Sequence, residues 1–444
     1  MKQTILVAGA GRSSIYLIEY LLENALRKKW HVIVADGDKD AIMRKLNKHP
    51  CGEAAAIDIT NDEQRQSLVQ RADIVLSLMP PHLHILLAHD CLKFNKNLIT
   101  SSYISDEMKA MDEAVKKAGL VFMCEMGLDP GIDHMTASHI IHSVRKVAGR
   151  ITAFRSYCGG LVAPSSDDNP WHYKFSWNPR NVVMAGMGGA KYLSNGKVTE
   201  VPYEHMFENN KKIKVPGLGS LAYYPNRDSV KYLDILDVQG INTFLRATLR
   251  YPAFCKGWQA IIKLGLTDLE DTMDTTGLTY AGWIRKKTDC RPKTDILKHV
   301  ATILGIEESD KVMGMLLWLG IFEDNAIGDS KMSSADVLYT LLQEKWQMSP
   351  KDKDMVVMQH EIEYEHKGKL ITLTSSMVLE GDGGEHTAMA KTVGLPMGIL
   401  ASLMLRKKVT PPVGVHMPVM PVVYKPVLKE LEQHGIIFHD VVNG

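Results

Sequence analysis

Short apolar runs alternate with helix-length amphipathic segments through the first 125 residues. A continuous apolar run at residues 5–8 is typical of a strand covered on both faces, and from Ile15 onward apolar side chains recur along one helical face. Further apolar runs that predict strands lie at residues 31–36, 54–59, 73–79, 97–102 and 120–124. Strands separated by helices predict a doubly wound parallel sheet with right-handed crossovers, an α/β fold.

The pattern changes after residue 126. A turn rich in Gly and Pro at residues 126–134 precedes a predicted helix that runs to about Val147. The segments that follow are predicted as mixed strands with long loops at 150–237, helices at 240–348, a hairpin with strands at 355–365 and 370–378 that turns at Lys367-Gly368, and helices from near His386 and near Val427.

Two local patterns make sharper predictions. Thr60 is followed three residues later by Glu63, a capping-box spacing that predicts a helix starting at Thr60. Aromatic residues alternate at period two, which favours a half-buried strand face and leaves open a wall that keeps water from a cofactor. These aromatic residues are Trp171, Tyr173, Phe175 and Trp177.

Composition and charge narrow the class of protein. Apolar residues make up 45% of the 444 residues, enough for a sizeable core. Lys plus Arg number 52 against 51 Asp plus Glu, so no bulk field favours nucleic acid or an anionic membrane, and neither is expected as a partner. The six cysteines contain no CxxC pair, and the histidines lack acidic or Cys partners at ligand spacing. We therefore expect a cytoplasmic protein with reduced thiols and no metal site.

A glycine-rich turn closes the first predicted strand and opens the first helix. Gly9 and Gly11 let the backbone approach a pyrophosphate, and Ser14 takes the place of the third glycine of a G-x-G-x-x-G fingerprint. Asp36 closes the second strand, where an acidic side chain accepts hydrogen bonds from a ribose and repels a 2′-phosphate. The sequence therefore predicts NAD, with NADP less favoured. Further predicted cofactor contacts are Arg12, Ser13, Asp58, Ile59, Met79 and Pro80.

Four longer stretches resemble one enzyme family from end to end and in the same order. They lie at residues 127–134, 156–161 followed by 169–180, 224–229 and 388–396, and they are similar to the glutamate-forming saccharopine dehydrogenases, or saccharopine reductases. The resemblance implies reversible oxidative cleavage of saccharopine by NAD(P) and water, which gives glutamate and 2-aminoadipate 6-semialdehyde in lysine metabolism. It also implies a homodimer. Residues 164–167 and 171–173 depart from the pattern of many relatives, beside the expected substrate loop.

Three domains follow from the pattern together with this resemblance. A Rossmann dinucleotide-binding domain is expected at residues 1–126, completed by about 390–444. An α+β substrate-binding and dimerisation domain with a mixed sheet is expected at 127–240 and 349–389, and an inserted all-helical domain at 241–348.

The predicted substrate site follows from the chemistry of a secondary amine with three carboxylates. Arg227 is the expected carboxylate clamp, because a guanidinium is always charged and offers a fork of donors; pairing with Asp228 at the surface is the alternative. Asp129, Cys158 and Tyr103 are the expected catalytic residues, although Asp129 could equally cap a helix and Cys158 could simply fill a core. The other expected substrate contacts are Asn226, Ser101, Ser102, Gly159, Gly160, Tyr173 and Lys174.

Two other functions stay open at this point. One is a related imine-type dehydrogenase of similar build, such as a carboxynorspermidine dehydrogenase. The other is a catalytically silent dinucleotide-binding scaffold, which the retention of Arg227, Asp129, Tyr103 and Cys158 disfavours.

Overall fold

A computed structural model describes residues 2–208 and 210–443 of the chain. The chain groups into two compact units. Unit 1 combines the residues up to Thr152 with Asp234–Gln239 and the residues from His360 onward, and unit 2 combines Ala153–Leu233 with Gly240–Gln359. The division between the units falls within two long strands, β7 and β15. The predicted helical segment is therefore not separated from the strands that precede it in unit 2.

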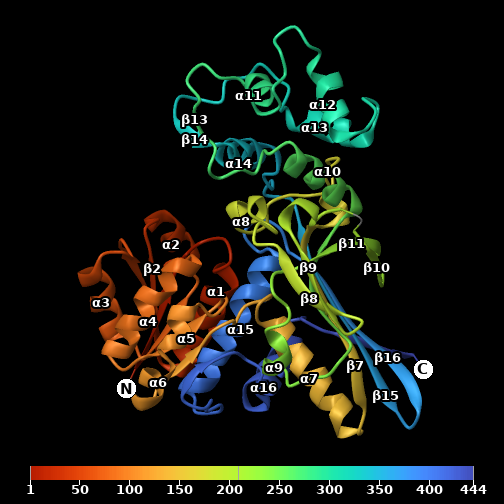
Figure 1. Cartoon of the computed structure of the whole chain (residues 1–444). Helices are drawn as coiled ribbons and strands as arrows, with labels where there is room; N and C mark the ends of the chain where they lie inside the picture. The colour runs from red at the N-terminus through yellow and green to blue at the C-terminus, as the bar shows by residue number, and fades with distance from the viewer. Residues whose placement is uncertain (1, 209, 444) are drawn as a thin grey trace. The chain divides into compact units, whose positions relative to one another are not determined.

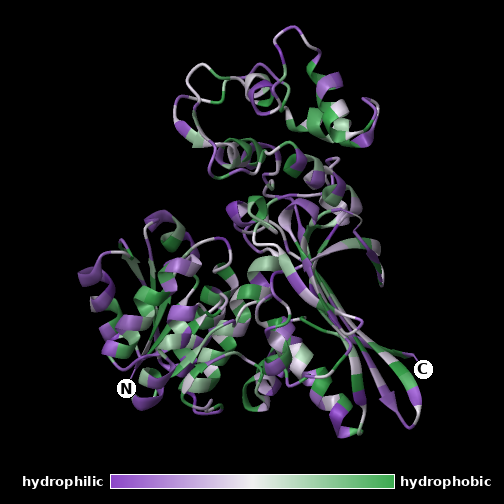
Figure 2. Ribbon diagram, in the orientation of Figure 1, coloured by the Kyte–Doolittle hydropathy of each residue, from purple (hydrophilic) through white to green (hydrophobic). Residues whose placement is uncertain are grey.

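Unit 1 contains the predicted parallel sheet. Every pairing along this sheet is parallel. Its strand order is β17 (Gly414–His416), β6 (Val121–Met123), β5 (Asn97–Thr100), β4 (Ile74–Ser77), β1 (Gln3–Ala8), β2 (Trp30–Asp36) and β3 (Gly52–Ala56). The prediction of a doubly wound sheet is confirmed, and β17 from the far end of the chain completes it. Figure 2 shows the apolar strands of this sheet between helices of mixed polarity.

Helices flank this sheet. They are α1 (Ile15–Lys28), α2 (Lys39–Leu46), α3 (Asp62–Arg71), η1 (Pro81–Leu83), α4 (His84–Lys93), α5 (Asp106–Ala110) and α6 (Asp112–Lys117). The predicted capping box at Thr60 is wrong. The N-cap of α3 is Asn61, whose side chain accepts from Gln64 N, because Thr60 is held instead by the carboxylate of Asp58.

Two C-terminal helices complete unit 1 beside α7 (Ile132–Lys146). They are α15 (Ala388–Leu405) and α16 (Pro421–Gln433), and Figure 1 shows α15 beside α1. The contact is close: a Cβ built on Gly394 would lie 3.0 Å from Ser13 O, next to the glycine-rich turn. By length and composition alone α15 could cross a membrane, but 78% of it is buried inside the protein, as in a core helix.

The predicted hairpin is also present. It consists of β15 (Asp354–His366) and β16 (Lys369–Glu380), and Lys367 and Gly368 turn between them with positive φ. In unit 1, β16 pairs with β18 (His439–Asn443) in antiparallel register.

Unit 2 begins with a mixed sheet. In it β12 (Thr243–Arg250) pairs parallel with β7 (Arg150–Val162) and antiparallel with β11 (Gly219–Pro225). The sheet continues through β10 (Lys212–Val215), β8 (Ala190–Ser194) and β9 (Lys197–Val201), with short helical turns at η2 (Pro164–Ser166), α8 (Pro179–Val183), η3 (Tyr203–His205) and α9 (Tyr232–Ile235). The helical prediction therefore begins too early, because the apolar run that contains β12 is a strand buried in this sheet.

The helical part of unit 2 starts at Pro252. It contains α10 (Pro252–Lys263), α11 (Tyr280–Lys287), α12 (Ile296–Leu304), α13 (Lys311–Leu319) and α14 (Ser334–Lys345), with a small pair of strands, β13 (Thr272–Asp274) and β14 (Lys331–Ser333). The predicted strand of alternating aromatics is wrong. Trp171, Tyr173 and Phe175 lie outside any strand and pack around Trp346 in the core of this unit.

Candidate functional site

The glycine-rich turn lies between β1 and α1, as predicted. Gly9 has a φ of 107°, and a Cβ on it would lie 3.0 Å from the backbone of Leu78, so this position requires glycine. No atom lies within 4 Å of a Cβ built on Gly11. The exposed side of the turn is therefore open where a ligand's phosphates would approach the N-terminus of α1.

Asp36 is bound by the same turn. Its Oδ2 accepts from Ala10 N at 2.6 Å, and its Oδ1 accepts from Asp38 N at 3.0 Å. The sequence predicts that this carboxylate accepts hydrogen bonds from a ribose, whereas in the structure it fixes the turn. Each oxygen keeps a further lone pair, so contact with a ribose stays a prediction.

Lys45 on α2 is a functional candidate that the sequence argument missed. Its buried Nζ donates to Ala10 O at 2.5 Å, to Gly11 O at 2.6 Å and to Ser14 Oγ at 3.1 Å. Burial lowers the pKa of this ammonium. Lys45 therefore connects the two ends of the turn through these hydrogen bonds. No sequence motif marks this lysine, because it lies in an ordinary amphipathic helix.

The other predicted cofactor residues divide into two groups. Arg12 and Ser13 lie in the turn, and Met79 and Pro80 follow β4 next to Leu78, the residue that packs against Gly9. Two residues beyond β3 have local roles: Ile59 is buried in the core, and Asp58 is exposed. The carboxylate of Asp58 accepts from the hydroxyl and the backbone N–H of Thr60, and these bonds lower its pKa. Contact with a cofactor stays a prediction for all six.

Two predicted catalytic residues are brought together in unit 1. The Tyr103 hydroxyl, beyond β5, donates to Asp129 Oδ1 at 3.0 Å. Asp129 does not cap α7, since the N-cap is Gly131 and no side chain bonds it. Both residues are half-buried, so the pair can meet a ligand. The third predicted residue, Cys158, is buried in β7 of unit 2, where it lies opposite Thr248.

A buried histidine holds one of the predicted serines. His84 Nε2 lies 2.9 Å from Ser102 Oγ, and its Nδ1 lies 2.7 Å from Ser77 Oγ. Burial, with a smaller contribution from His82, lowers the pKa of His84 from 6.5 to about 4. The imidazole is therefore neutral near pH 7, with one nitrogen donating and the other accepting. Ser101 is the half-buried neighbour of Ser102.

A second buried pair joins the segments that carry Tyr103 and Asp129. Glu125 Oε1 accepts from Ile104 N at 3.0 Å, and its Oε2 lies 2.8 Å from His134 Nε2. Asp133 Oδ1 accepts from Gly131 N at 2.7 Å. These contacts position the Tyr103–Asp129 pair.

The predicted substrate residues of unit 2 stand in different surroundings. Arg227 is exposed on the loop after β11 with a φ of 52°, and the backbone N–H of its neighbour Asn226 donates to Arg246 O. Gly159 and Gly160 are buried in β7. A Cβ on Gly159 would lie 2.6 Å from Leu249 O, so this glycine is required by strand packing.

Lys174 and Tyr173 serve the protein interior. Lys174 Nζ lies 2.7 Å from Asp168 and 2.9 Å from Asp352. Burial alone would lower the pKa of Lys174, but the bonds to these two carboxylates raise it. Its charge is already neutralised, which argues against a role as a substrate cation. Tyr173 is 1% exposed, which argues for a role in the aromatic core.

Arg250, at the end of β12, is the second missed candidate. It is 3% exposed, and its guanidinium lies over the rings of Tyr173, Tyr224 and Phe254 at 5.3, 5.9 and 5.4 Å. It makes a single hydrogen bond, from Nη1 to Leu249 O, and Nε has no partner. No described carboxylate pairs with this charge. The sequence did contain a signal for this candidate, since two arginines, Arg246 and Arg250, interrupt the apolar run of β12.

A buried guanidinium without a nearby anion lowers the stability of the protein unless a bound ligand supplies that anion. Arg250 has the chemistry to bind a carboxylate by a charge-assisted hydrogen bond. The chain thus holds an open glycine-rich turn and a Tyr–Asp pair in unit 1, and an unpaired buried cation in unit 2.

Comparisons with known proteins agree with this picture. Residues 5–123 match a family model described as the saccharopine dehydrogenase NADP binding domain, and residues 127–436 match one described as the saccharopine dehydrogenase C-terminal domain. The chain is 31% identical to saccharopine dehydrogenase [NADP(+), L-glutamate-forming] of Schizosaccharomyces pombe, over 98% of this chain and 97% of that one.

Longer relatives and a solved structure are also similar. The mitochondrial alpha-aminoadipic semialdehyde synthase of Mus musculus is 34% identical over 99% of this chain, which spans only 48% of that protein, about half its length. The apo structure of saccharopine dehydrogenase (L-Glu forming) from Saccharomyces cerevisiae superposes with a TM-score of 0.89 at 29% identity and covers 100% of both chains.

Proposed function

The chain belongs to the saccharopine dehydrogenase family, and we propose that it oxidises saccharopine with a nicotinamide dinucleotide to give L-glutamate and 2-aminoadipate 6-semialdehyde. The longer relatives contain about twice as many residues, so the proposal concerns this reaction and not the full activity of those proteins. The reaction is reversible, and it belongs to lysine metabolism.

The choice of substrate rests on a single observation, the buried guanidinium of Arg250 that has no anionic partner among the described residues. A substrate with three carboxylates supplies the anion that this buried guanidinium lacks among the described residues. The exposed Arg227 supplies a second cation for another carboxylate, as the sequence argument expected.

The glycine-rich turn fits a dinucleotide. Gly11 leaves the side of the turn open, and the N-terminus of α1 favours the negative charge of a pyrophosphate. When bound there, the nicotinamide group supplies the acceptor for a hydride. Lys45 and Asp36 keep the turn in the conformation that receives the phosphates.

The Tyr103–Asp129 pair manages protons in the proposed reaction. Hydride leaves the carbon only when the neighbouring amine nitrogen has lost its proton, because its lone pair forms the imine. Water then adds to the imine carbon and loses a proton. The carbinolamine that results breaks its C–N bond to form the aldehyde, and a proton returns to the nitrogen that leaves with glutamate. A carboxylate that accepts from a tyrosine hydroxyl can receive such a proton, while Tyr103 orients the amine or the water. His84 keeps Ser102 in one orientation at the same edge of the sheet.

NADP is the cofactor that we propose, in place of the NAD expected from Asp36 alone. The similar enzymes from Schizosaccharomyces pombe and Saccharomyces cerevisiae are named for NADP(+). Because both carboxylate oxygens of Asp36 accept backbone N–H bonds, part of its charge is already compensated. Arg12 is exposed in the turn where a phosphate would bind. A higher kcat/KM with NAD than with NADP would contradict this proposal.

The reaction is tested by following reduced nicotinamide absorbance with saccharopine, and by identifying glutamate and the semialdehyde by mass spectrometry. Turnover of carboxynorspermidine but not of saccharopine would instead support the related imine-type dehydrogenase. Binding of NADP without turnover of either compound would support the silent scaffold. We also propose a cytoplasmic homodimer; the six free cysteines favour a reducing compartment.

A further inference from the structure

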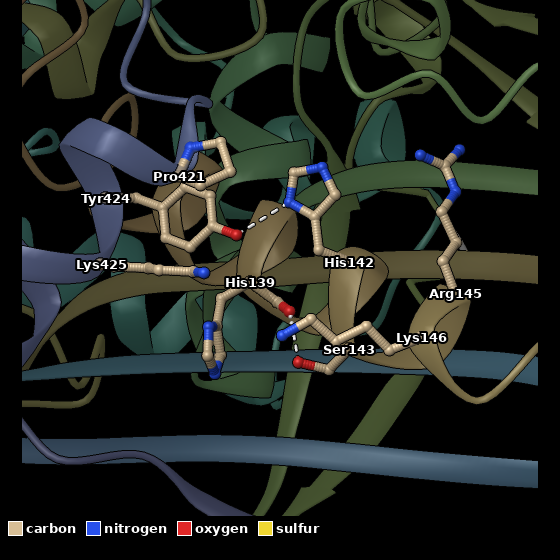
Figure 3. A pocket seen from close by; sticks show the side chains of 8 residues that line it. All are labelled: His139, His142, Ser143, Arg145, Lys146, Pro421, Tyr424 and Lys425. Carbon is tan, nitrogen blue, oxygen red and sulfur yellow. Dashed lines mark hydrogen bonds between the residues drawn. The ribbon is translucent and has the colours of Figure 1, made fainter.

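A cavity of about 370 Å³ lies between α7 and α16 in unit 1 (Figure 3). Its lining residues include no residue of the glycine-rich turn and neither member of the Tyr103–Asp129 pair. The side chains that matter for its chemistry are His139, His142 and Lys146 from α7 and Pro421, Tyr424 and Lys425 from α16.

Positive charge in this pocket is only partly compensated. Arg145 at its edge is paired with Asp237, at 3.0 Å between Nη1 and Oδ2. Lys146 and Lys425 have no hydrogen-bond or ion-pair partner anywhere in residues 2–208 and 210–443. Both ammonium groups point toward the middle of the labelled side chains, and they come from different helices (Figure 3). Two unpaired cations that face one space favour an anion between them.

The wall of the pocket is fixed and carries apolar surface. Tyr424 is 1% exposed, and its hydroxyl lies 2.8 Å from His142 Nδ1. The two rings are nearly parallel, with an interplanar angle of 14° and centroids 5.8 Å apart. His139 packs edge-on against the same tyrosine. Pro421 adds a further apolar face, so carbon atoms of a ligand have a surface to contact.

We propose that this pocket binds a small molecule with at least two anionic groups, carboxylates or phosphates. The two lysines bind the anionic groups, and the partly exposed ring of His142 and the exposed Pro421 contact the carbon atoms of the ligand. The cavity volume lies in the range of small-molecule sites, which fits a compact metabolite. The inference is independent of the proposed reaction, because none of these residues takes part in it.

Calorimetric titration of the full chain tests the proposal. The protein is first saturated with NADP, so that the phosphate-binding site at the glycine-rich turn is already occupied. Citrate and pyrophosphate are the probes, with acetate and sodium chloride at matched ionic strength as monovalent controls. We expect saturable binding of at least one probe. Tighter binding of citrate would identify carboxylates as the preferred anionic groups, and tighter binding of pyrophosphate would identify phosphates.

Paired variants locate the binding. Lys146→Gln with Lys425→Gln should weaken the probe at least 10-fold, since both charges are lost. Lys109→Gln with Lys117→Gln is the matched control, because these exposed lysines of α5 and α6 also have no hydrogen-bond or ion-pair partner among the described residues, and the two substitutions change the net charge equally. Equal weakening in both double variants, unchanged binding in the pocket variant, or heats no larger than those of acetate would each overturn the proposal.

A second readout comes from His142. Its pKa is lowered first by burial and then by the cations Arg145 and Lys425 and by His139, while Asp237 acts in the opposite direction. A dianion between the lysines should therefore raise the pKa of His142, as followed by its imidazole NMR signals, in the wild type but not in the pocket variant. A citrate- or pyrophosphate-saturated protein whose His142 titrates as before would contradict binding at this site.

Discussion

Replacing Arg250 with methionine separates a role in substrate binding from a role in folding. Methionine keeps an unbranched chain about as long as the methylene stem of arginine, but it lacks the guanidinium, so the buried charge and its donors are lost. If Arg250 binds a substrate carboxylate, the variant should keep most of its stability without ligand, while its binding of saccharopine weakens. If the guanidinium is part of the core, the opposite should be observed.

The structure sets the expected size of each effect. In the free protein the guanidinium gains about 0.5–2 kcal/mol from each of three rings and about 1.5–3 kcal/mol from one hydrogen bond. Removing it from water costs several kcal/mol, so the free energy of unfolding should change by no more than about 2 kcal/mol. Loss of a desolvated carboxylate contact should cost about 2–4 kcal/mol, or a roughly 30-fold to 1000-fold loss in kcat/KM for saccharopine.

Urea unfolding and steady-state kinetics of Arg250→Met measure the two effects side by side. Arg250→Lys is the matched control, because it keeps a charge but loses the fork of donors, and it should fall between wild type and Arg250→Met in kcat/KM. The KM for NADP should stay near its wild-type value in both. A loss of more than about 3 kcal/mol in stability with unchanged saccharopine kinetics would show that Arg250 is structural and would refute the reasoning.

Four further changes test the remaining assignments. Asp36→Ser should raise the KM for both cofactors about 10-fold by loosening the turn, and should shift preference further toward NADP; equal and unchanged KM values would exclude both roles. Lys45→Met should weaken NADP binding at least about 10-fold, measured by fluorescence titration, with saccharopine KM nearly unchanged. Tyr103→Phe, which removes the hydrogen bond to Asp129, should slow turnover by about 10-fold to 100-fold, and an unaltered pH–rate profile would place the proton path elsewhere. His84 has a folded pKa lowered from 6.5 to about 4, so its contribution to stability is full above pH 6.5 and falls by ~3 kcal/mol as the pH drops to 4. Urea unfolding at pH 7 and pH 4 should show that His84→Gln lacks this part of the loss.

Continuous apolar strands and glycine spacing carried most of what the sequence could predict. The run ending at Ala8 is buried on both faces, and Gly9 follows with the positive φ that the turn requires, so pattern and geometry agree there. The same reasoning failed for β12, because an apolar strand and a buried helix segment have similar composition. The period-two spacing of Trp171 and Tyr173 also led to a wrong prediction, because these residues lie in an irregular segment that packs into the aromatic core.

Residues that act across the chain had no local signal. Lys45 lies more than thirty residues beyond the turn that it binds, and its spacing in α2 is that of any surface lysine. The contact from Tyr103 to Asp129 joins the ends of two adjacent strands. The sequence placed Tyr103 at the carboxyl edge of the parallel sheet, where ligands bind, but it did not predict the hydrogen bond to Asp129.

The proposed preference for NADP depends on more than the identity of the residue at position 36. An acidic residue at the end of the second strand favours NAD only if its carboxylate is free to meet the ribose. Here Ala10 N and Asp38 N both donate to Asp36, and the buried ammonium of Lys45 donates to Ala10 O in the same turn. The negative charge that would repel a 2′-phosphate is thus part of a local network with a compensating cation. Discrimination between NAD and NADP therefore depends on how Asp36 and Lys45 act together, which predicts that the double variant Asp36→Ser with Lys45→Met will not be the sum of the two single ones.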